Sequence, residues 1–340
     1  MSEVKIAVFG CGFWSRFQIG GWFELPDARV VALYNRTISR ARERAREFNI
    51  DHCYDDAEQL LQECPEIDVV DIITDVDTHE KFVTLAAKYK KDVICQKPMA
   101  PDLEAARRMM KVIREAGVRY YIHENYRWQP QFRRVKEILD KGVIGRPFRC
   151  KSYFLTAYPV FETQPFLADL EQFALTDQGS HQFDVLRYFF GEVESLYCIS
   201  QRVNPYIKGE DVTTTVIKMQ NGVTCVQEIS FSSILQKEVF PQTLLLIEGS
   251  QGSIRLDPDL VIHTTTRAGT DTEVVPLKKY KWQTDRLTNE PPSIVACNDN
   301  ILNDLLGRGQ AETTGDDNFK TVELVFAAYD SARNNKVMVF

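Results

Sequence analysis

The sequence lacks a long hydrophobic run. It begins Met1-Ser2-Glu3-Val4-Lys5 and continues directly into a short apolar stretch. A membrane-spanning helix needs about 20 predominantly apolar residues, and a secretory signal needs a continuous apolar core behind its basic start. We therefore expect a cytoplasmic protein with no membrane partner.

Metal-binding and disulfide patterns are also missing. The eight cysteines stand at positions 11, 53, 64, 95, 150, 198, 225 and 297, with no Cys-x-x-Cys pair and no histidines at zinc spacing. We expect reduced thiols and no metal. The net charge of −7 is unlike the basic excess of nucleic-acid-binding proteins, so a small molecule is the expected partner and nucleic acid is not.

The chain has 340 residues and no internal repeat, which favours two domains over a single core. Its first third alternates β-rich and helical stretches, the pattern of an α/β protein with a parallel sheet. Strands are expected at 4–9, 29–34, 69–73, 92–95 and 118–122, and helices at 39–48, 57–63, 79–90 and 103–116. We assign residues 1–124 to a doubly wound Rossmann domain.

The pattern of expected helices and strands changes after residue 124. A helix is expected at 131–141, followed by alternating runs at 148–158, 193–202, 211–219, 223–231 and 242–248, with turns at 220–222 and 249–252. Hairpin-like turns between such runs indicate a mainly antiparallel sheet. Helices at 294–306 and 318–332 close a C-terminal α+β domain, residues 125–340, to which we assign substrate binding and oligomerisation.

A glycine-rich turn follows the first expected strand. The run Gly10-Cys11-Gly12-Phe13-Trp14-Ser15 lies between this strand and a helix. The first glycine permits a tight turn, the second lets the backbone approach a pyrophosphate, and free N–H groups at the helix start bind anions. We expect Gly10, Gly12, Phe13 and Trp14 to border a dinucleotide. A purely structural turn is the alternative.

The end of the second expected strand bears on cofactor choice. An NAD-specific fold usually places an acidic residue there to bind the ribose hydroxyls, but this sequence has Asn35-Arg36. Asn35 lacks the charge that would repel a 2′-phosphate, and Arg36 could pair with one. The cofactor is therefore NAD or NADP, with NADP slightly favoured. Alternatively, Arg36 covers the adenine or faces solvent.

Two further segments carry residues suited to catalysis. Gln96-Lys97-Pro98 ends the strand expected at 92–95, and open α/β sheets bind ligands at the carboxyl ends of their strands. The second segment runs from Asp177 to Asp184 and places His181 among small and acidic neighbours, as a general acid or base with an orienting carboxylate requires. An N-cap cluster before a helix at 185–190 explains the same residues equally well.

Together, the glycine turn, Lys97-Pro98, the segment His123-Glu124-Asn125-Tyr126-Arg127-Trp128 and the Asp-x-Gly-x-His run resemble the Gfo/Idh/MocA oxidoreductase family. The resemblance implies that Lys97 and His181 lie beside the nicotinamide and that Asp177 helps to orient them. Gln96 replaces the glutamate of the family's Glu-Lys-Pro motif, which puts a charge partnership between Lys97 and that neighbour in doubt. The variant motif is similar to a subgroup that contains D-apiose dehydrogenases.

Other residues are expected near the ligands. In the resembled family the loop that begins at Thr74 borders the cofactor, and His79 at its end either contacts the cofactor or caps a helix. Gln96 and Lys97 are also expected to bind the cofactor. Arg127 and Trp128 open the second domain at the expected interdomain cleft, where a guanidinium and an indole suit a sugar. With Lys97, Asp177 and His181 they form the predicted substrate-binding set.

The sequence thus predicts an NAD(P)-dependent dehydrogenase that acts on a CH–OH group. It transfers a hydride between a sugar or polyol hydroxyl, D-apiose or a related aldose being one candidate, and nicotinamide. Two alternatives stay open: a redox-neutral isomerase, epimerase or lyase that recycles NAD(P), and a non-catalytic nucleotide sensor. The exposed face of the second sheet would need cover, which favours a homodimer or homotetramer.

Overall fold

The computed structural model describes residues 3–284 and 289–340. Contacts between Cα atoms divide the chain into a first unit, Met1–Trp128 with Lys278–Val322, and a second unit, Gln129–Leu277 with Glu323–Phe340. Residues 278–322, which the sequence assigns to the second domain, thus group with the first unit. The sequence-based division at residues 124 and 125 stays a prediction.

The first unit contains a parallel sheet. Its six strands among the described residues have the order β3-β2-β1-β4-β5-β6, and each neighbouring pair is parallel. The strands are β1 (Val4–Phe9), β2 (Ala28–Tyr34), β3 (His52–Tyr54), β4 (Val69–Ile72), β5 (Asp92–Gln96) and β6 (Tyr120–His123). This topology confirms the Rossmann fold expected from the alternating pattern.

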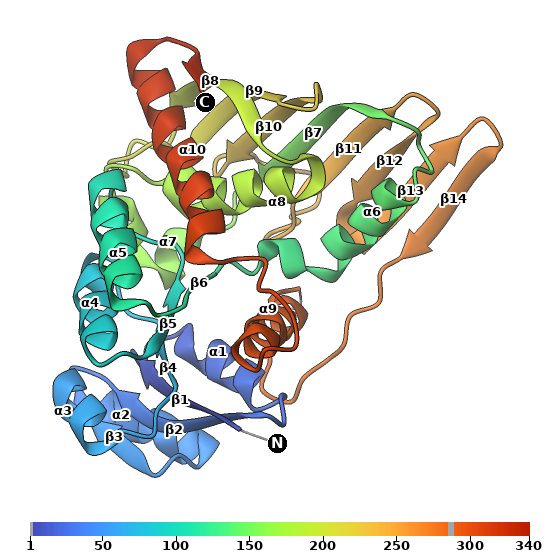
Figure 1. Ribbon diagram of the computed structural model, residues 1–340. Helices are drawn as coiled ribbons and strands as arrows, with labels where there is room; N and C mark the ends of the chain where they lie inside the picture. The colour runs from blue at the N-terminus through green and yellow to red at the C-terminus, as the bar shows by residue number, and fades with distance from the viewer. Residues whose placement is uncertain (1–2, 285–288) are drawn as a thin grey trace. The chain divides into compact units, whose positions relative to one another are not determined.

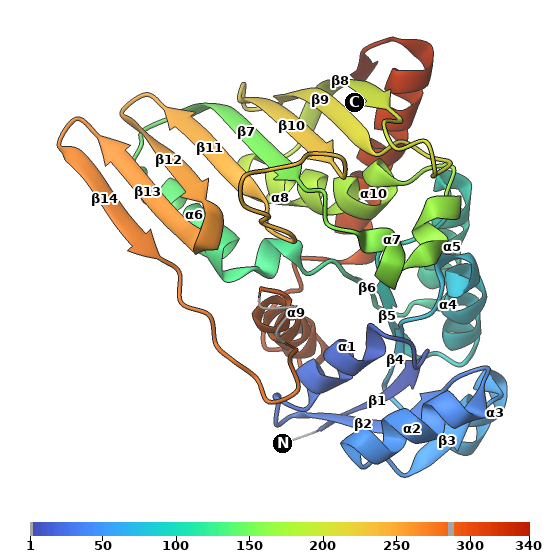
Figure 2. The same cartoon turned by 180° about the vertical axis from the view of Figure 1, so that it is seen from behind.

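Helices cover both faces of this sheet. α1 (Ser15–Trp22) and α9 (Glu290–Leu305) lie together on one face, and α4 (His79–Lys88) and α5 (Leu103–Ala116) lie on the other (Figures 1 and 2). α1 and α9 approach closely because Gly21 has no side chain: a Cβ there would lie 2.8 Å from Ile294 and Asn298. The unit also contains α2 (Ile38–Phe48), α3 (Ala57–Glu63), the 3-10 turns η1 (Val76–Thr78) and η2 (Tyr126–Trp128), and the start of α10 (Gly315–Asn334).

The second unit is built on a larger, mainly antiparallel sheet. Among the described residues nine strands have the order β14-β13-β12-β11-β7-β10-β9-β8-β15, and the pair β7–β10 is parallel. The strands are β7 (Pro147–Leu155), β8 (Val193–Gln201), β9 (Val212–Met219), β10 (Thr224–Ser230), β11 (Leu244–Gly249), β12 (Gly252–Asp257), β13 (Val261–Thr266), β14 (Gly269–Val274) and β15 (Met338–Val339). The expected mainly antiparallel domain is confirmed.

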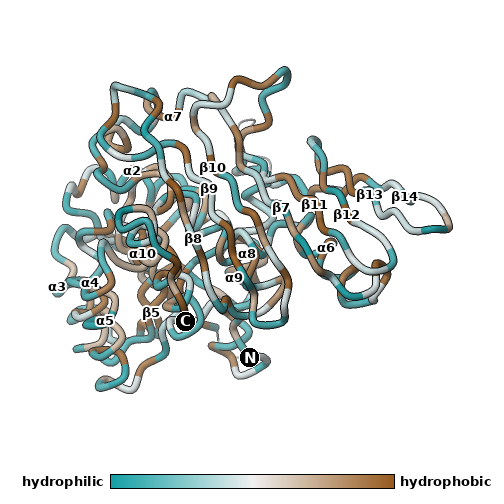
Figure 3. Tube along the Cα trace, turned by 90° about the horizontal axis from the view of Figure 1, so that it is seen from above, coloured by the Kyte–Doolittle hydropathy of each residue, from teal (hydrophilic) through white to brown (hydrophobic). Residues whose placement is uncertain are grey.

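Within this unit, α6 (Pro130–Asp140) and α8 (Ser180–Phe190) lie on the same face of the sheet (Figures 1 and 2). The remaining elements are α7 (Val160–Thr163), the short turns η3 (Pro165–Asp169), η4 (Leu175–Gly179) and η5 (Pro258–Leu260), and the end of α10. Figure 3 shows the contrast between hydrophobic β5 of the first unit and mostly hydrophilic β14. Across residues 3–284 and 289–340, no helix has the length and hydrophobicity that a bilayer crossing requires.

Candidate functional site

The glycine turn has the geometry of a phosphate-binding loop. Gly10 has φ +104°, and a Cβ there would lie 2.5 Å from the carbonyl oxygen of Ile73. Only glycine fits such a position without strain. At Gly12, by contrast, a Cβ would have no described atom within 4 Å, so the backbone faces open space immediately before α1. The turn therefore leaves room for a pyrophosphate beside the helix start.

Neighbouring side chains hold the turn in place. The buried Ser15 hydroxyl donates to the Gly12 carbonyl oxygen at 2.7 Å. Asn35 accepts from the backbone N–H of Cys11 at 3.0 Å and donates to the Thr37 carbonyl at 3.0 Å. Asn35 is therefore a structural part of the turn as well as the residue at the end of β2.

The other residues predicted near the cofactor differ in exposure. Phe13 is 70% exposed, and Arg36 is also exposed. Trp14 packs against the core of the first unit. Exposure leaves Phe13 and Arg36 accessible to a ligand, whereas most of Trp14 serves packing.

Thr74 and His79 border the same edge of the sheet. The methyl group of Thr74 lies 3.1 Å from where a Gly10 Cβ would stand. The His79 ring is buried, with Nδ1 3.1 Å from the Pro98 carbonyl oxygen and Nε2 3.1 Å from that of Thr74. Burial lowers the pKa of His79. This side chain joins the loop after β4 to the segment after β5, a role that sequence reasoning did not assign to it.

Lys97 stands beside an acidic residue that sequence reasoning missed. Gln96 of β5 pairs with His123 of β6, so the next residues, Lys97 and Glu124, leave adjacent strands at the same edge. Glu124 is fully buried and accepts from the Tyr126 backbone N–H at 3.1 Å. Burial raises the pKa of Glu124 to about 7, while the charge of Lys97 opposes this shift. The available signal was the position of Glu124 directly after a buried strand.

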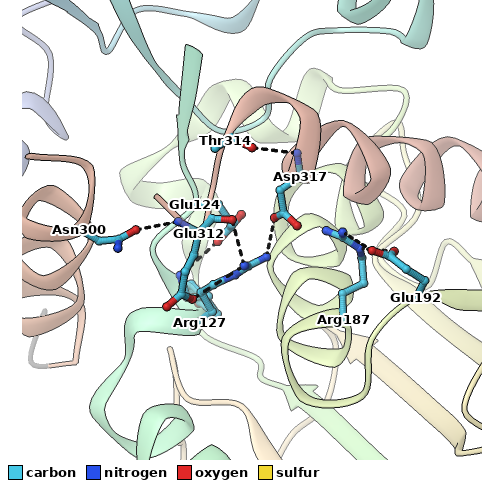
Figure 4. Close-up of polar contacts among 9 residues, drawn as sticks. Glu124, Arg127, Arg187, Glu192, Asn300, Glu312, Thr314 and Asp317 are labelled. Carbon is cyan, nitrogen blue, oxygen red and sulfur yellow. Dashed lines mark hydrogen bonds and ion pairs between the residues drawn. The ribbon is translucent and has the colours of Figure 1, made fainter. Parts of the chain in front are cut away.

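Arg127 lies in a network of ion pairs and hydrogen bonds (Figure 4). Arg127 is 5% exposed, and its guanidinium donates to the Asp317 carboxylate at 2.8 Å and to the Glu312 carbonyl oxygen at 3.3 Å. Asn300 accepts from the Glu312 backbone N–H, and Thr314 accepts from that of Asp317. Residues of the 312–317 segment therefore fix the guanidinium. Direct contact of Arg127 with a substrate stays a prediction.

In the second unit, Asp177 and His181 lie on a continuous helical segment. Asp177 belongs to η4, a π-helical turn, and His181 to α8. Residues four apart on a helix lie close to one face, and π-helical turns occur frequently at functional sites. His181 is 4% exposed, and Asp177 is half-buried.

The expected helix at 185–190 was too short at its N-terminal end. Helical structure begins before the motif, and the N-cap positions are Ala174 and Gly179 rather than residues of an Asp/Ser cluster. The cause is distant in sequence: the buried Glu210 carboxylate accepts from the backbone N–H groups of Phe173 and Leu175. Tyr329 accepts from the Thr176 N–H and donates to Glu210.

Two protein-family models and several known proteins match the chain. Residues 4–124 match the model "Oxidoreductase family, NAD-binding Rossmann fold", and residues 132–255 match "GFO/IDH/MocA C-terminal domain". A D-apiose dehydrogenase of Rhizobium rhizogenes is 36% identical over 99% of this chain and 98% of its own, and one of Paraburkholderia graminis is 37% identical over 99% and 90%. An Agrobacterium radiobacter oxidoreductase, solved with NAD⁺, L-tartaric acid and magnesium, matches with TM-score 0.96 and 36% identity over 99% and 98%.

The fold, the glycine turn and the match to the family model together define an oxidoreductase with an NAD-binding Rossmann domain. The chain belongs to the Gfo/Idh/MocA oxidoreductase family. The resemblance inferred from the motifs is thereby confirmed over nearly the whole chain.

The two glycines of the turn should respond differently to substitution. Gly10→Ala should lower the free energy of unfolding by roughly 2 kcal/mol or more, because a Cβ meets backbone at a positive φ. Gly12→Ala should leave stability within about 1 kcal/mol of wild type but weaken NAD⁺ binding at least about tenfold, because the methyl group enters the space for pyrophosphate. Urea unfolding and NAD⁺ titration measure the two effects. Unchanged NAD⁺ affinity in Gly12→Ala would contradict the cofactor assignment.

Glu124→Gln should change how stability depends on pH. The folded-state pKa of Glu124, about 7, lies above the ordinary 4.5. Its carboxyl therefore stabilises the fold fully below pH 4.5, and this contribution is lost as pH rises through 7. Relative to wild type, Glu124→Gln should gain up to about 3 kcal/mol between about pH 5 and about pH 8. Urea unfolding across pH measures this gain, with the exposed Glu66→Gln as control.

Proposed function

We propose that this protein oxidises a hydroxyl group of a sugar, D-apiose or a related aldose, with NAD⁺ as the hydride acceptor. The observation that carries the proposal is the position of Lys97. It follows β5 at the sheet edge that also holds the glycine turn and Thr74. The names of two relatives at 36% and 37% identity support D-apiose as the substrate.

The residues of this edge fit a dinucleotide. The open space at Gly12 and the start of α1 suit a pyrophosphate, and NAD⁺ when bound supplies the hydride acceptor. We assign its binding to the glycine turn, the end of β2 and the segments after β4 and β5. The residues are Gly10, Gly12, Phe13, Trp14, Asn35, Arg36, Thr74, His79, Gln96 and Lys97.

Proton transfer is assigned to Lys97 and His181. The substrate hydroxyl must lose its proton as the carbon-bound hydride leaves, and either side chain could accept it. If Lys97 stays charged, it stabilises the developing alkoxide and His181 is the base. Asp177, about one helical turn from His181, orients the imidazole. Glu124 lies beside Lys97, whose charge opposes the rise that burial causes in the pKa of the Glu124 carboxyl.

Trp128 and Arg127 are the proposed substrate residues of η2. The half-buried Trp128 indole offers an apolar face to a sugar ring. The Arg127 guanidinium is held by Asp317 and Glu312, so we assign it, besides substrate contact, the role of fixing η2 and thereby placing Trp128.

Cofactor preference and assembly extend the proposal. Asn35 brings no negative charge to the end of β2, and Arg36 is exposed, which supports use of NADP as well as NAD.

The exposed Ile199 and Val216 of neighbouring strands β8 and β9 support association into a homodimer or homotetramer, which light scattering measures. A cytoplasmic location stays a prediction from the sequence.

A sugar panel assayed with both cofactors tests the reaction. Incubation of D-apiose, other aldoses and polyols with NAD⁺ or NADP⁺ should produce reduced cofactor and an oxidised sugar in equal amounts. A changed sugar without accumulated reduced cofactor would instead favour a redox-neutral isomerase, epimerase or lyase. Cofactor binding without any turnover would favour a nucleotide sensor.

Lys97→Ala and His181→Ala test the assigned residues. Each should lower kcat with D-apiose at least about 100-fold, because each removes a proton-transfer or charge-stabilising group. NAD⁺ affinity should stay within about threefold of wild type, as measured by titration. The exposed Lys88→Ala is the matched control. Equal losses of NAD⁺ binding and turnover would show that these side chains are structural.

A further inference from the structure

A buried chain of hydrogen bonds leads from β4 to the backbone of Lys97. The Asp71 carboxylate accepts from Trp22 Nε1 at 2.8 Å and from Gln18 Nε2 at 2.7 Å. Gln18 Oε1 accepts from Gln96 Nε2 at 2.8 Å, and Gln96 Oε1 accepts from the Lys97 backbone N–H at 2.8 Å. Asp71, Gln18 and Trp22 are fully buried, and Gln96 is 9% exposed.

The chemistry of the two ends sets the direction of this chain. The indole of Trp22 and the backbone N–H of Lys97 can only donate. Each glutamine between them passes the direction on, because its amide accepts on one side and donates on the other. All four hydrogen bonds can form only if one member accepts on both sides. The Asp71 carboxylate is that member, because both of its oxygens accept. Burial raises its pKa to about 7, and the hydrogen bonds from Trp22 and Gln18 oppose this shift.

We propose that Asp71 is a positioning residue for Lys97, acting through the amides of Gln18 and Gln96. The inference rests on the proposed role of Lys97 in the reaction. The Asp71 carboxylate orients Gln18, and Gln18 orients Gln96. Gln96 in turn holds the backbone at the point where the polypeptide leaves β5. Two observations support a specific role: a carboxylate stands in an apolar interior, where an unpaired charge is costly, and both of its oxygens are used.

Asp71→Asn should break the direction of the chain. An asparagine accepts through one atom and donates through the other, so somewhere along the chain two donors must face each other. The mismatch should fall at the Lys97 end, because Trp22 is fully buried while Gln96 and Lys97 are partly accessible to water. With D-apiose and NAD⁺, kcat should fall roughly 10- to 100-fold, and the Kd for NAD⁺ should change less than about threefold.

A second substitution should restore the chain. In Asp71→Asn/Gln96→Glu, the new carboxylate accepts from the Lys97 N–H and from Gln18 Nε2. Gln18 turns its amide and accepts from the amide group of the introduced asparagine, whose oxygen still accepts from Trp22 Nε1. All four hydrogen bonds are formed again, with the glutamine of α1 now donating toward position 96. The kcat of this double variant should return to within about threefold of wild type.

Two controls make the rescue specific. Asp71→Asn/Gln96→Met supplies no acceptor and should stay impaired. Asp68→Asn, which changes an exposed carboxylate bonded to the Lys5 N–H before the same strand, should keep its activity. Circular dichroism verifies that each variant folds. Full kcat in Asp71→Asn, or equal rescue by methionine and glutamate, would overturn the proposal.

Failure of this inference is distinguishable from failure of the proposed function. If Lys97→Ala keeps its activity, the function assigned to Lys97 is wrong whatever the Asp71 variants do. The hydrogen-bond chain is then tested by the urea midpoint of unfolding, which should fall in Asp71→Asn and recover in the double variant with glutamate. No recovery with glutamate would show that the four bonds do not form a directional chain.

Discussion

Parallel pairing of β1, β4, β5 and β6 is the constraint on which the first unit's candidate residues depend. Parallel strands bring their carboxyl ends to one edge of a sheet. The glycine turn follows β1, Thr74 follows β4, Lys97 follows β5 and Glu124 follows β6. Gly10 and Thr74, 64 positions apart, and Lys97 and Glu124, 27 positions apart, therefore become neighbours through strand pairing. Any shift of β6 against β5 would remove Glu124 from Lys97.

Buried polar groups then fix the segments that leave this edge. Each one would cost free energy in an apolar interior unless it were hydrogen-bonded. His79 lies between the carbonyl groups of Thr74 and Pro98, and Asp71 satisfies two donors. Such partners make alternative loop positions unfavourable, because a buried donor or acceptor that loses its hydrogen bond costs roughly 1–3 kcal/mol. A rigid edge suits chemistry that depends on placement.

Several elements could be predicted from local sequence because their end signals are local. α3 and α5 begin after the capping residues Asp56 and Asp102, and α5 ends at Gly117 with φ 67°. The predicted bounds of both helices, 57–63 and 103–116, agree with the structure. β3, with three residues, and β14, with mostly exposed side chains, carry little hydrophobic pattern and were not predicted.

The remaining features depend on contacts between distant residues. The π-helical turn before His181 is anchored by Glu210 and Tyr329, and no local pattern encodes those partners. Asp317, 190 residues away, accepts from the Arg127 guanidinium, a contact that the local sequence does not encode, while the predicted contact of Arg127 with a sugar stays a prediction. Lys97 could be predicted because strand position alone suggested a role. Glu124 carried the same signal, but its place beside Lys97 could not be predicted, since the register of β5 and β6 is a property of the folded sheet.

The neutral residue at position 96 gains a physical explanation from these contacts. Lys97 does not need an acidic neighbour in sequence, because Glu124 brings a carboxylate from the adjacent strand. A glutamate at position 96 beside an ionised Asp71 would leave Gln18 with acceptors on both sides and only one amide group to donate. Gln96 instead donates to Gln18 and accepts from Lys97. The amide at position 96 and the carboxylate at position 71 are thus two parts of one arrangement, and a change at either position constrains the other.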